Sequence, residues 1–111
     1  MTSLSTHVLD TMHGRPAAGM ALVLNGPDGE IARGTTNADG RCPELMQGEL
    51  TAGRYAIRFS VAAYFRDQGV ALPDPPFLDE VVVDFGIATD GGHYHVPLLV
   101  SPYGCSTYRG S

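Results

Sequence analysis

The sequence predicts an all-β fold, a two-sheet β-sandwich with Greek-key connections and one short helix. Its 111 residues suit one domain with a core of its own. The 14 glycines and 8 prolines are scattered between short apolar runs, as tight turns between strands require. Apolar residues recur at every second position in several segments, which is the period of a half-buried strand. We therefore expect residues 1–111 to form a single domain with at least seven short strands.

The first half of the chain contains three of the predicted strands. In residues 4–8, Leu4, Thr6 and Val8 share one face, which leaves Ser5 and His7 on the other. Residues 20–25 are more apolar and end at the turn signal of residues 26–29. A weaker strand over residues 31–36 is followed by an Asn-Ala-Asp-Gly sequence, which is typical of a turn.

The second half contains the clearest alternation. Residues 54–60 and 80–87 each place their apolar side chains on one face and charged or small ones on the other. Between them, residues 60–68 predict a two-turn helix that begins at a serine and is followed by a glycine. The proline-rich residues 70–78 predict an irregular loop, and residues 93–100 predict the last strand.

The two terminal strands turn their histidines away from the predicted core. In residues 4–8 the apolar face excludes His7, and in residues 93–100 it excludes His93 and His95. The sequence therefore predicts that several imidazoles lie on the outer face of the sandwich.

Charge and composition exclude several classes of protein. The net charge is −5 and no basic run is present, which argues against nucleic acid or an anionic membrane as partner. The chain shows no signal peptide and no apolar stretch of the length of a membrane span, so we expect a cytoplasmic protein. Cys42 and Cys105 form neither a disulfide framework nor a zinc motif, and we expect free, partly buried thiols.

Histidine and arginine carry the candidate chemistry. Histidine exchanges protons near neutral pH, and an arginine can stabilise an oxyanion, so the two together can hydrolyse an amide without a metal. His13 lies in a loop, where a plain surface role is the simpler interpretation. For His93 and His95 the simpler interpretation is two exposed strand residues, and a metal-binding pair is the alternative, although no third ligand is evident nearby. The residues alone predict no more than a β-sandwich with a histidine-lined face.

The chain resembles the transthyretin-related 5-hydroxyisourate hydrolases, and the resemblance spans its whole length. The tail motif is the most specific part of this match. The matching segments are LSTHVLD at residues 4–10 with GRPA at 14–17, TNADGR at 36–41, HYHVPLL at 93–99, SPYG at 101–104 and STYRGS at 106–111.

This resemblance implies a transthyretin-like sandwich that assembles as a homotetramer, a dimer of dimers with substrate pockets at the dimer–dimer interface. It implies hydrolytic opening of the six-membered ring of 5-hydroxyisourate to 2-oxo-4-hydroxy-4-carboxy-5-ureidoimidazoline, a step in urate degradation to allantoin. It implies no cofactor and no metal. The implied catalytic residues are His7, Arg41, His95 and Ser111, and the implied substrate-binding residues are His7, Arg41, Tyr108, Arg109 and Gly110.

Cys105 departs from the family pattern, which usually has tyrosine at this position. A thiol provides less packing area than an aromatic ring, so we expect altered stability or pocket shape rather than lost chemistry.

Two other functions share this fold, so the fold cannot decide between them. A transthyretin-like carrier of a small ligand needs an open channel with apolar walls, whereas His7, Arg41 and His95 would make the channel polar. An adhesion-type sandwich without chemistry gives no reason for placing these three residues together.

Overall fold

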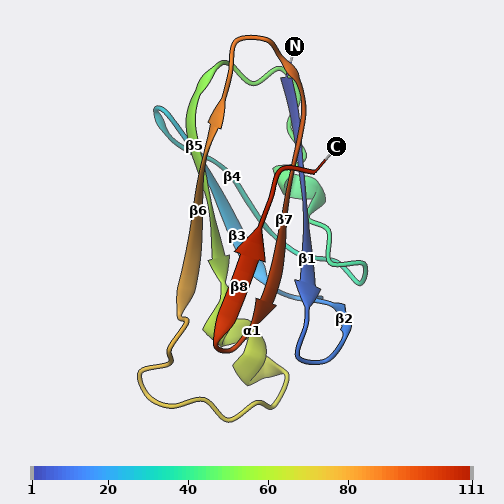
Figure 1. The fold of residues 1–111 in the computed structure, drawn as a ribbon, viewed down its shortest axis with the longest axis vertical. Helices are drawn as coiled ribbons and strands as arrows, with labels where there is room; N and C mark the ends of the chain where they lie inside the picture. The colour runs from blue at the N-terminus through green and yellow to red at the C-terminus, as the bar shows by residue number, and fades with distance from the viewer. Residues whose placement is uncertain (1, 111) are drawn as a thin grey trace.

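The computed structural model describes residues 2–110, which form two β-sheets packed face to face with one short α-helix at one end (Figure 1). The predicted β-sandwich is therefore confirmed. In chain order, the elements of residues 2–110 are β1 (Thr2–Asp10), β2 (Arg15–Pro16), β3 (Ala21–Gly26), β4 (Gly29–Thr35), the 3₁₀ helix η1 (Pro43–Leu45), β5 (Gly53–Ser60), α1 (Val61–Asp67), β6 (Glu80–Ile87), β7 (Gly92–Ser101) and β8 (Gly104–Thr107).

The strand order places β1, the first strand of the chain, beside β7 near its other end. One sheet has the order β2-β1-β7-β8 and the other β4-β3-β5-β6. Strands β1 and β7 pair in parallel from Thr2 opposite Gly92 to Asp10 opposite Val100, whereas the other named strand pairs are antiparallel. The segments that carry the predicted histidines are thus neighbours in space (Figure 1).

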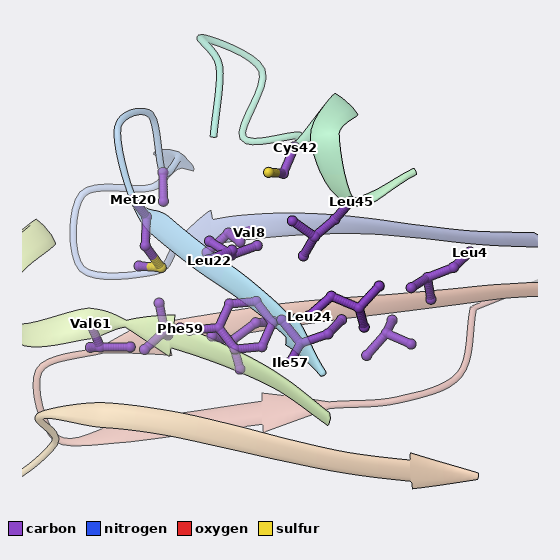
Figure 2. Close-up of a cluster of buried hydrophobic side chains, with 14 of the residues drawn as sticks. Leu4, Val8, Met20, Leu22, Leu24, Cys42, Leu45, Ile57, Phe59 and Val61 are labelled. Carbon is purple, nitrogen blue, oxygen red and sulfur yellow. The ribbon is translucent and has the colours of Figure 1, made fainter. Parts of the chain in front are cut away.

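The core lies between the two sheets, as the alternation in sequence predicts. Figure 2 shows Leu22 and Leu24 of β3 beside Ile57 and Phe59 of β5, facing Val8 of β1. All five side chains are at most 1% exposed. Their burial removes apolar surface from water, which is the main force that holds the two sheets together.

Helix α1 confirms the predicted helix with shorter bounds. Ser60 stands at the N-cap position, but its side chain makes no capping hydrogen bond. Gly69 has a φ of +82°, the left-handed conformation that favours glycine just after a helix. Within residues 2–110 no helix has the length and apolarity required to span a membrane.

The six strands predicted individually are all present, with ends that differ by at most two residues. Strand β8 was not predicted, because its four residues are all exposed and show no alternation of buried and exposed side chains. The two-residue β2 and η1 are likewise too short to give a periodic signal.

The two cysteines differ from the prediction that both are partly buried. Both thiols are free, but Cys42 is fully buried and Cys105 is exposed. Burial raises the pKa of the Cys42 thiol to about 11, so this sulfur stays protonated and unreactive at neutral pH. Cys105 is exposed because β8 lies at the edge of its sheet.

A buried carboxylate fixes the end of β1. Asp10 is 1% exposed and accepts a hydrogen bond from the Tyr64 hydroxyl at 2.7 Å. His13 donates to it from Nδ1 at 2.6 Å and from its backbone N–H at 2.9 Å. His13 therefore has a structural role that sequence analysis, which treated it as a plain surface residue, did not predict. Burial would raise the pKa of the Asp10 carboxyl, but the hydrogen bonds from Tyr64 and His13 hold it below its usual value.

We expect Asp10→Asn to lower the free energy of unfolding by about 2 kcal/mol at neutral pH, because an amide oxygen replaces two carboxylate acceptors. A lowered pKa in the folded state stabilises the fold above the unfolded pKa, and this contribution is lost as pH falls through the folded pKa. The difference between variant and wild type should therefore shrink in acid. Urea unfolding across the acid range measures it, with the exposed Asp28→Asn as control. A difference in the free energy of unfolding between Asp10→Asn and the wild type that does not change with pH would contradict this account.

Candidate active site

The parallel pairing of β1 and β7 places the predicted histidines on one face of the sandwich. Ser5 lies opposite His95 and His7 lies opposite Pro97. Since alternate residues of a strand share a face, His7 and His95 both point away from the core side chains of their strands. Both are half-buried. The predicted outward direction of these two imidazoles is confirmed.

Arg41 reaches the same face from a hydrogen-bonded turn beside β1. The Asn37 side chain accepts hydrogen bonds from the backbone N–H groups of Asp39 and Arg41 at 3.0 and 3.1 Å. Gly40 has a φ of +76°, and a Cβ there would collide with the Val8 carbonyl. This close approach lets Arg41 pair with His7 across an isolated β-bridge.

The same turn determines which nitrogen of His7 carries a proton. His7 Nε2 lies 2.7 Å from the Asp39 carbonyl oxygen. A carbonyl only accepts hydrogen bonds, so Nε2 must donate. When the ring is neutral, Nδ1 is the nitrogen that retains a lone pair.

The ring of His95 is held by Ser5 of the neighbouring strand β1. The Ser5 hydroxyl lies 2.8 Å from His95 Nδ1. Burial is the main cause that lowers the pKa of His95, and the positive charge of Arg41 and the imidazoles of His7 and His93 lower it further. His95 is therefore mainly neutral at neutral pH, which is the state that can accept a proton from water.

The C-terminal tail is attached to β7 next to His95. Gly110 donates its backbone N–H to the His95 carbonyl at 2.7 Å, and the two residues form an isolated bridge. A Cβ on Gly110 would lie 2.6 Å from His95 Cδ2, so only glycine fits against this ring. The Arg109 guanidinium stacks 3.8 Å from the centre of the Tyr94 ring. Backbone pairing and this cation–π contact both hold the tail.

The predicted site residues thus fall into three groups. His7, Arg41, His95 and Gly110 come together on one face. The Arg109 side chain instead packs on Tyr94, and the Tyr108 side chain is 60% exposed, so Arg109 and Gly110 rather than Tyr108 hold the tail within the chain. Ser111 lies outside the described residues.

Ser5 contacts this site and was not predicted, whereas His93 was considered only as an exposed strand residue or one half of a metal-binding pair. Ser5 and His93 are hydrogen-bonded to each other, and Ser5 also to His95. The signal was present in part, since Ser5 lies on the same face of its strand as His7. Its partner on β7 depends on the pairing of the two ends of the chain, which strand alternation does not specify.

The donor groups of the site do not form a metal centre. Across residues 2–110, no three histidine, cysteine or carboxylate side chains are arranged so that they could hold a metal ion. Two imidazoles, an arginine and a serine hydroxyl are instead suited to binding a polar or anionic molecule and to moving a proton.

Similarity to known proteins identifies the family of this chain. The model of the HIUase/Transthyretin family matches residues 4–110. The chain belongs to this family. It is 52% identical to the 5-hydroxyisourate hydrolase of Mesorhizobium japonicum, over 97% of this chain and 91% of the relative.

Solved structures of the HIUase/Transthyretin family show the same fold. The 5-hydroxyisourate hydrolase of Klebsiella pneumoniae superposes with a TM-score of 0.87 at 37% identity, over 100% of both chains. Sea bream transthyretin in complex with thyroxine superposes with a TM-score of 0.83 at 32% identity, over 96% of this chain and 93% of that one. The solved structures of this fold thus include both a hydrolase and a protein in complex with thyroxine, and the side chains of the site must distinguish the two functions.

Proposed function

We propose that this protein is a 5-hydroxyisourate hydrolase that opens the six-membered ring to 2-oxo-4-hydroxy-4-carboxy-5-ureidoimidazoline. The observation that carries this proposal is the half-buried His95, whose burial lowers its pKa, beside His7 and Arg41 on one face. The 52% identity to a 5-hydroxyisourate hydrolase over nearly the whole chain supports it.

The chemistry assigns separate tasks to His95 and Arg41, and the turn that carries Arg41 also orients His7. His95 removes a proton from water, which then attacks the ring carbonyl. Arg41 binds the anionic ring and stabilises the charge that develops on the carbonyl oxygen. His7 donates from Nε2 to the Asp39 carbonyl, so its ring is oriented by the turn that also carries Arg41. Ser111 is the fourth catalytic residue of the proposal, and Tyr108, Arg109 and Gly110 complete the substrate-binding set.

The proposal includes an assembly. A face with two histidines and an arginine is open in one subunit, and a second subunit packed on it would exclude water and strengthen its electrostatics. We therefore propose a homotetramer, a dimer of dimers with its sites at the dimer–dimer interface. Sedimentation equilibrium measures the mass directly, and a monomeric active enzyme would contradict this part.

The proposal also includes hydrolysis without a metal, a place in urate degradation and a cytoplasmic location. The lack of a three-ligand group within residues 2–110 supports hydrolysis without a metal. Urate degradation in the cytoplasm and a single domain over residues 1–111 stay predictions.

A carrier function is the alternative, since the fold is shared with transthyretin. A carrier for an apolar ligand would line this face with apolar side chains. Here His7, Arg41 and His95 occupy it, which favours catalysis.

One assay tests the proposal. Urate oxidase generates 5-hydroxyisourate, and its decay is followed by absorbance with and without the protein, in the presence of EDTA. We expect decay much faster than the spontaneous reaction and unaffected by the chelator. If the protein does not accelerate the decay, the hydrolase proposal is wrong, and saturable thyroxine binding would then favour the carrier. A rate that EDTA abolishes and zinc restores would contradict metal independence.

A further inference from the structure

Four side chains on the β1–β7 pair form a continuous line of hydrogen bonds. Ser3 Oγ lies 2.6 Å from His93 Nδ1, and Ser5 Oγ lies 2.9 Å from His93 Nε2. Ser5 Oγ also lies 2.8 Å from His95 Nδ1. Ser3 and Ser5 share one face of β1 while Leu4 between them faces the core, and His93 and His95 share the same face of β7 while Tyr94 between them faces the core. The parallel register therefore builds a line of groups that can each both give and take a proton.

The single proton of the Ser5 hydroxyl couples the two imidazoles. A serine hydroxyl can donate to only one of its two neighbours, so the other neighbour must donate to it. If Ser5 donates to His93 Nε2, His95 carries its proton on Nδ1 and has a lone pair on Nε2. If Ser5 donates to His95 Nδ1, His95 carries its proton on Nε2. In the first state His95 Nε2 can accept a proton, and in the second state the same nitrogen can donate one.

The surroundings of the two histidines differ in how well they accommodate positive charge. His95 is half-buried, and burial together with Arg41, His7 and His93 disfavours its charged form. His93 is exposed in the single subunit and lies opposite Ser3, away from the bridge between His7 and Arg41. An imidazolium is better solvated at an exposed position than beside an arginine in a half-buried one.

From this geometry we propose that Ser5 and His93 form a proton relay for His95, with Ser5 as the bridge and solvent-exposed His93 as the group that holds the proton between the two steps of ring opening. Ser5 and His93 are positioning residues that act through His95, and this assignment rests on the proposed hydrolase function. Neither residue belongs to the catalytic set that the resemblance implies.

The transfer is balanced at each step. His95 Nε2 takes a proton from the attacking water, while Nδ1–H passes its proton to Ser5 Oγ and the Ser5 hydroxyl passes its own to His93 Nε2. His95 is then neutral with a proton on Nε2, and the positive charge is on His93. In the second step His95 Nε2–H protonates the ring nitrogen as its bond to the carbonyl carbon breaks, and the two transfers run backwards. The enzyme returns to its starting state without net gain or loss of protons.

Three variants separate a relay from simple orientation of His95. Ser5→Ala removes the bridge, and Ser5→Thr keeps a hydroxyl at the same strand position. His93→Gln keeps a side chain that can hydrogen-bond to Ser5 but cannot hold a proton. We expect kcat to fall about 10- to 100-fold in Ser5→Ala and in His93→Gln with KM nearly unchanged, and Ser5→Thr to recover most of the loss. Ser101→Ala, at the far end of β7, is the matched serine control.

Because both residues act in one line, the double variant Ser5→Ala/His93→Gln should be no slower than either single variant. Proton inventories in mixtures of H₂O and D₂O should be curved for wild type, since more than one proton moves, and linear for Ser5→Ala. Nitrogen-15 spectra of the free protein should show that Ser5→Ala changes which ring nitrogen of His95 is protonated.

Each of these results tests a specific part of the relay proposal. Full kcat in Ser5→Ala would overturn the relay. A slow Ser5→Ala with a fully active His93→Gln would also overturn it, because Ser5 would then only orient His95. Additive losses in the double variant would mean that the two residues act separately. The hydrolase proposal fails separately, when wild type itself does not accelerate 5-hydroxyisourate decay.

Discussion

Replacing His95 with asparagine is expected to lower kcat by about 10²–10⁴-fold, the usual contribution of a positioned general base. Asparagine can still hydrogen-bond to Ser5, which lies 2.8 Å from His95 Nδ1, but it has no nitrogen that accepts a proton near neutral pH. The substitution therefore tests proton transfer with little change in packing. The measurement is steady-state hydrolysis of freshly generated 5-hydroxyisourate at several substrate concentrations.

The pH profile of the wild type supplies a second measure of the same residue. The lowered pKa of His95 means that the neutral base persists to a lower pH than for an ordinary histidine. Activity should fall only as pH drops through this lowered value, so the acid limb of kcat/KM should lie below the usual histidine range. In His95→Asn the residual activity should lack this limb.

His13→Asn is the matched control for this variant, because His13 contacts Asp10 at the end of β1 rather than the site. It should lose some stability and keep its kcat at low temperature. Circular dichroism and sedimentation must show that His95→Asn remains folded and assembled. Turnover within a few-fold of wild type in such a preparation would remove His95 from the mechanism.

Local alternation of side chains explains why the site face was predictable from the sequence. In β1 and β7 the pattern assigns Val8 and Val96 to the core, and the period of two then directs His7 and His95 outward. The alternation around those valines is a property of each strand by itself, so it can be recognised without knowing the partner strand. The strongly alternating β5 was predictable for the same reason.

Interactions between distant segments were not predictable in this way. No periodicity states that β1 pairs in parallel with β7, yet that register alone places Ser5 between His93 and His95. Hydrogen bonds across the pair depend on register to within one residue. For the same reason the contact of Arg109 with Tyr94 became visible only in the folded chain. The sequence gives the chemistry of a face more readily than the partners of its side chains.

Gly110→Ala is expected to lower kcat about 10²-fold, because a small displacement of a catalytic group can cost that much. The added Cβ would lie 2.6 Å from His95 Cδ2, which is closer than carbon atoms approach, and 3.1 Å from His95 Cβ, which is a tight contact. Either the tail or the imidazole must move, and Cδ2 is bonded to the nitrogen that takes the proton from water. Stability should change little, since Gly110 forms a single isolated bridge to β7 and is not part of the core between the sheets.

Gly104→Ala is the matched control, because the nearest atom to its added Cβ is Ser101 Oγ at 3.7 Å, an ordinary contact. It should retain kcat and KM, whereas Gly110→Ala should lose kcat and keep an unchanged melting temperature. A spectroscopic change of the His95 ring in Gly110→Ala, with His13 unaffected, would locate the displacement. If Gly110→Ala turns over as fast as Gly104→Ala, then the contact between the tail and His95 does not position the base, and the tail would act through substrate binding alone.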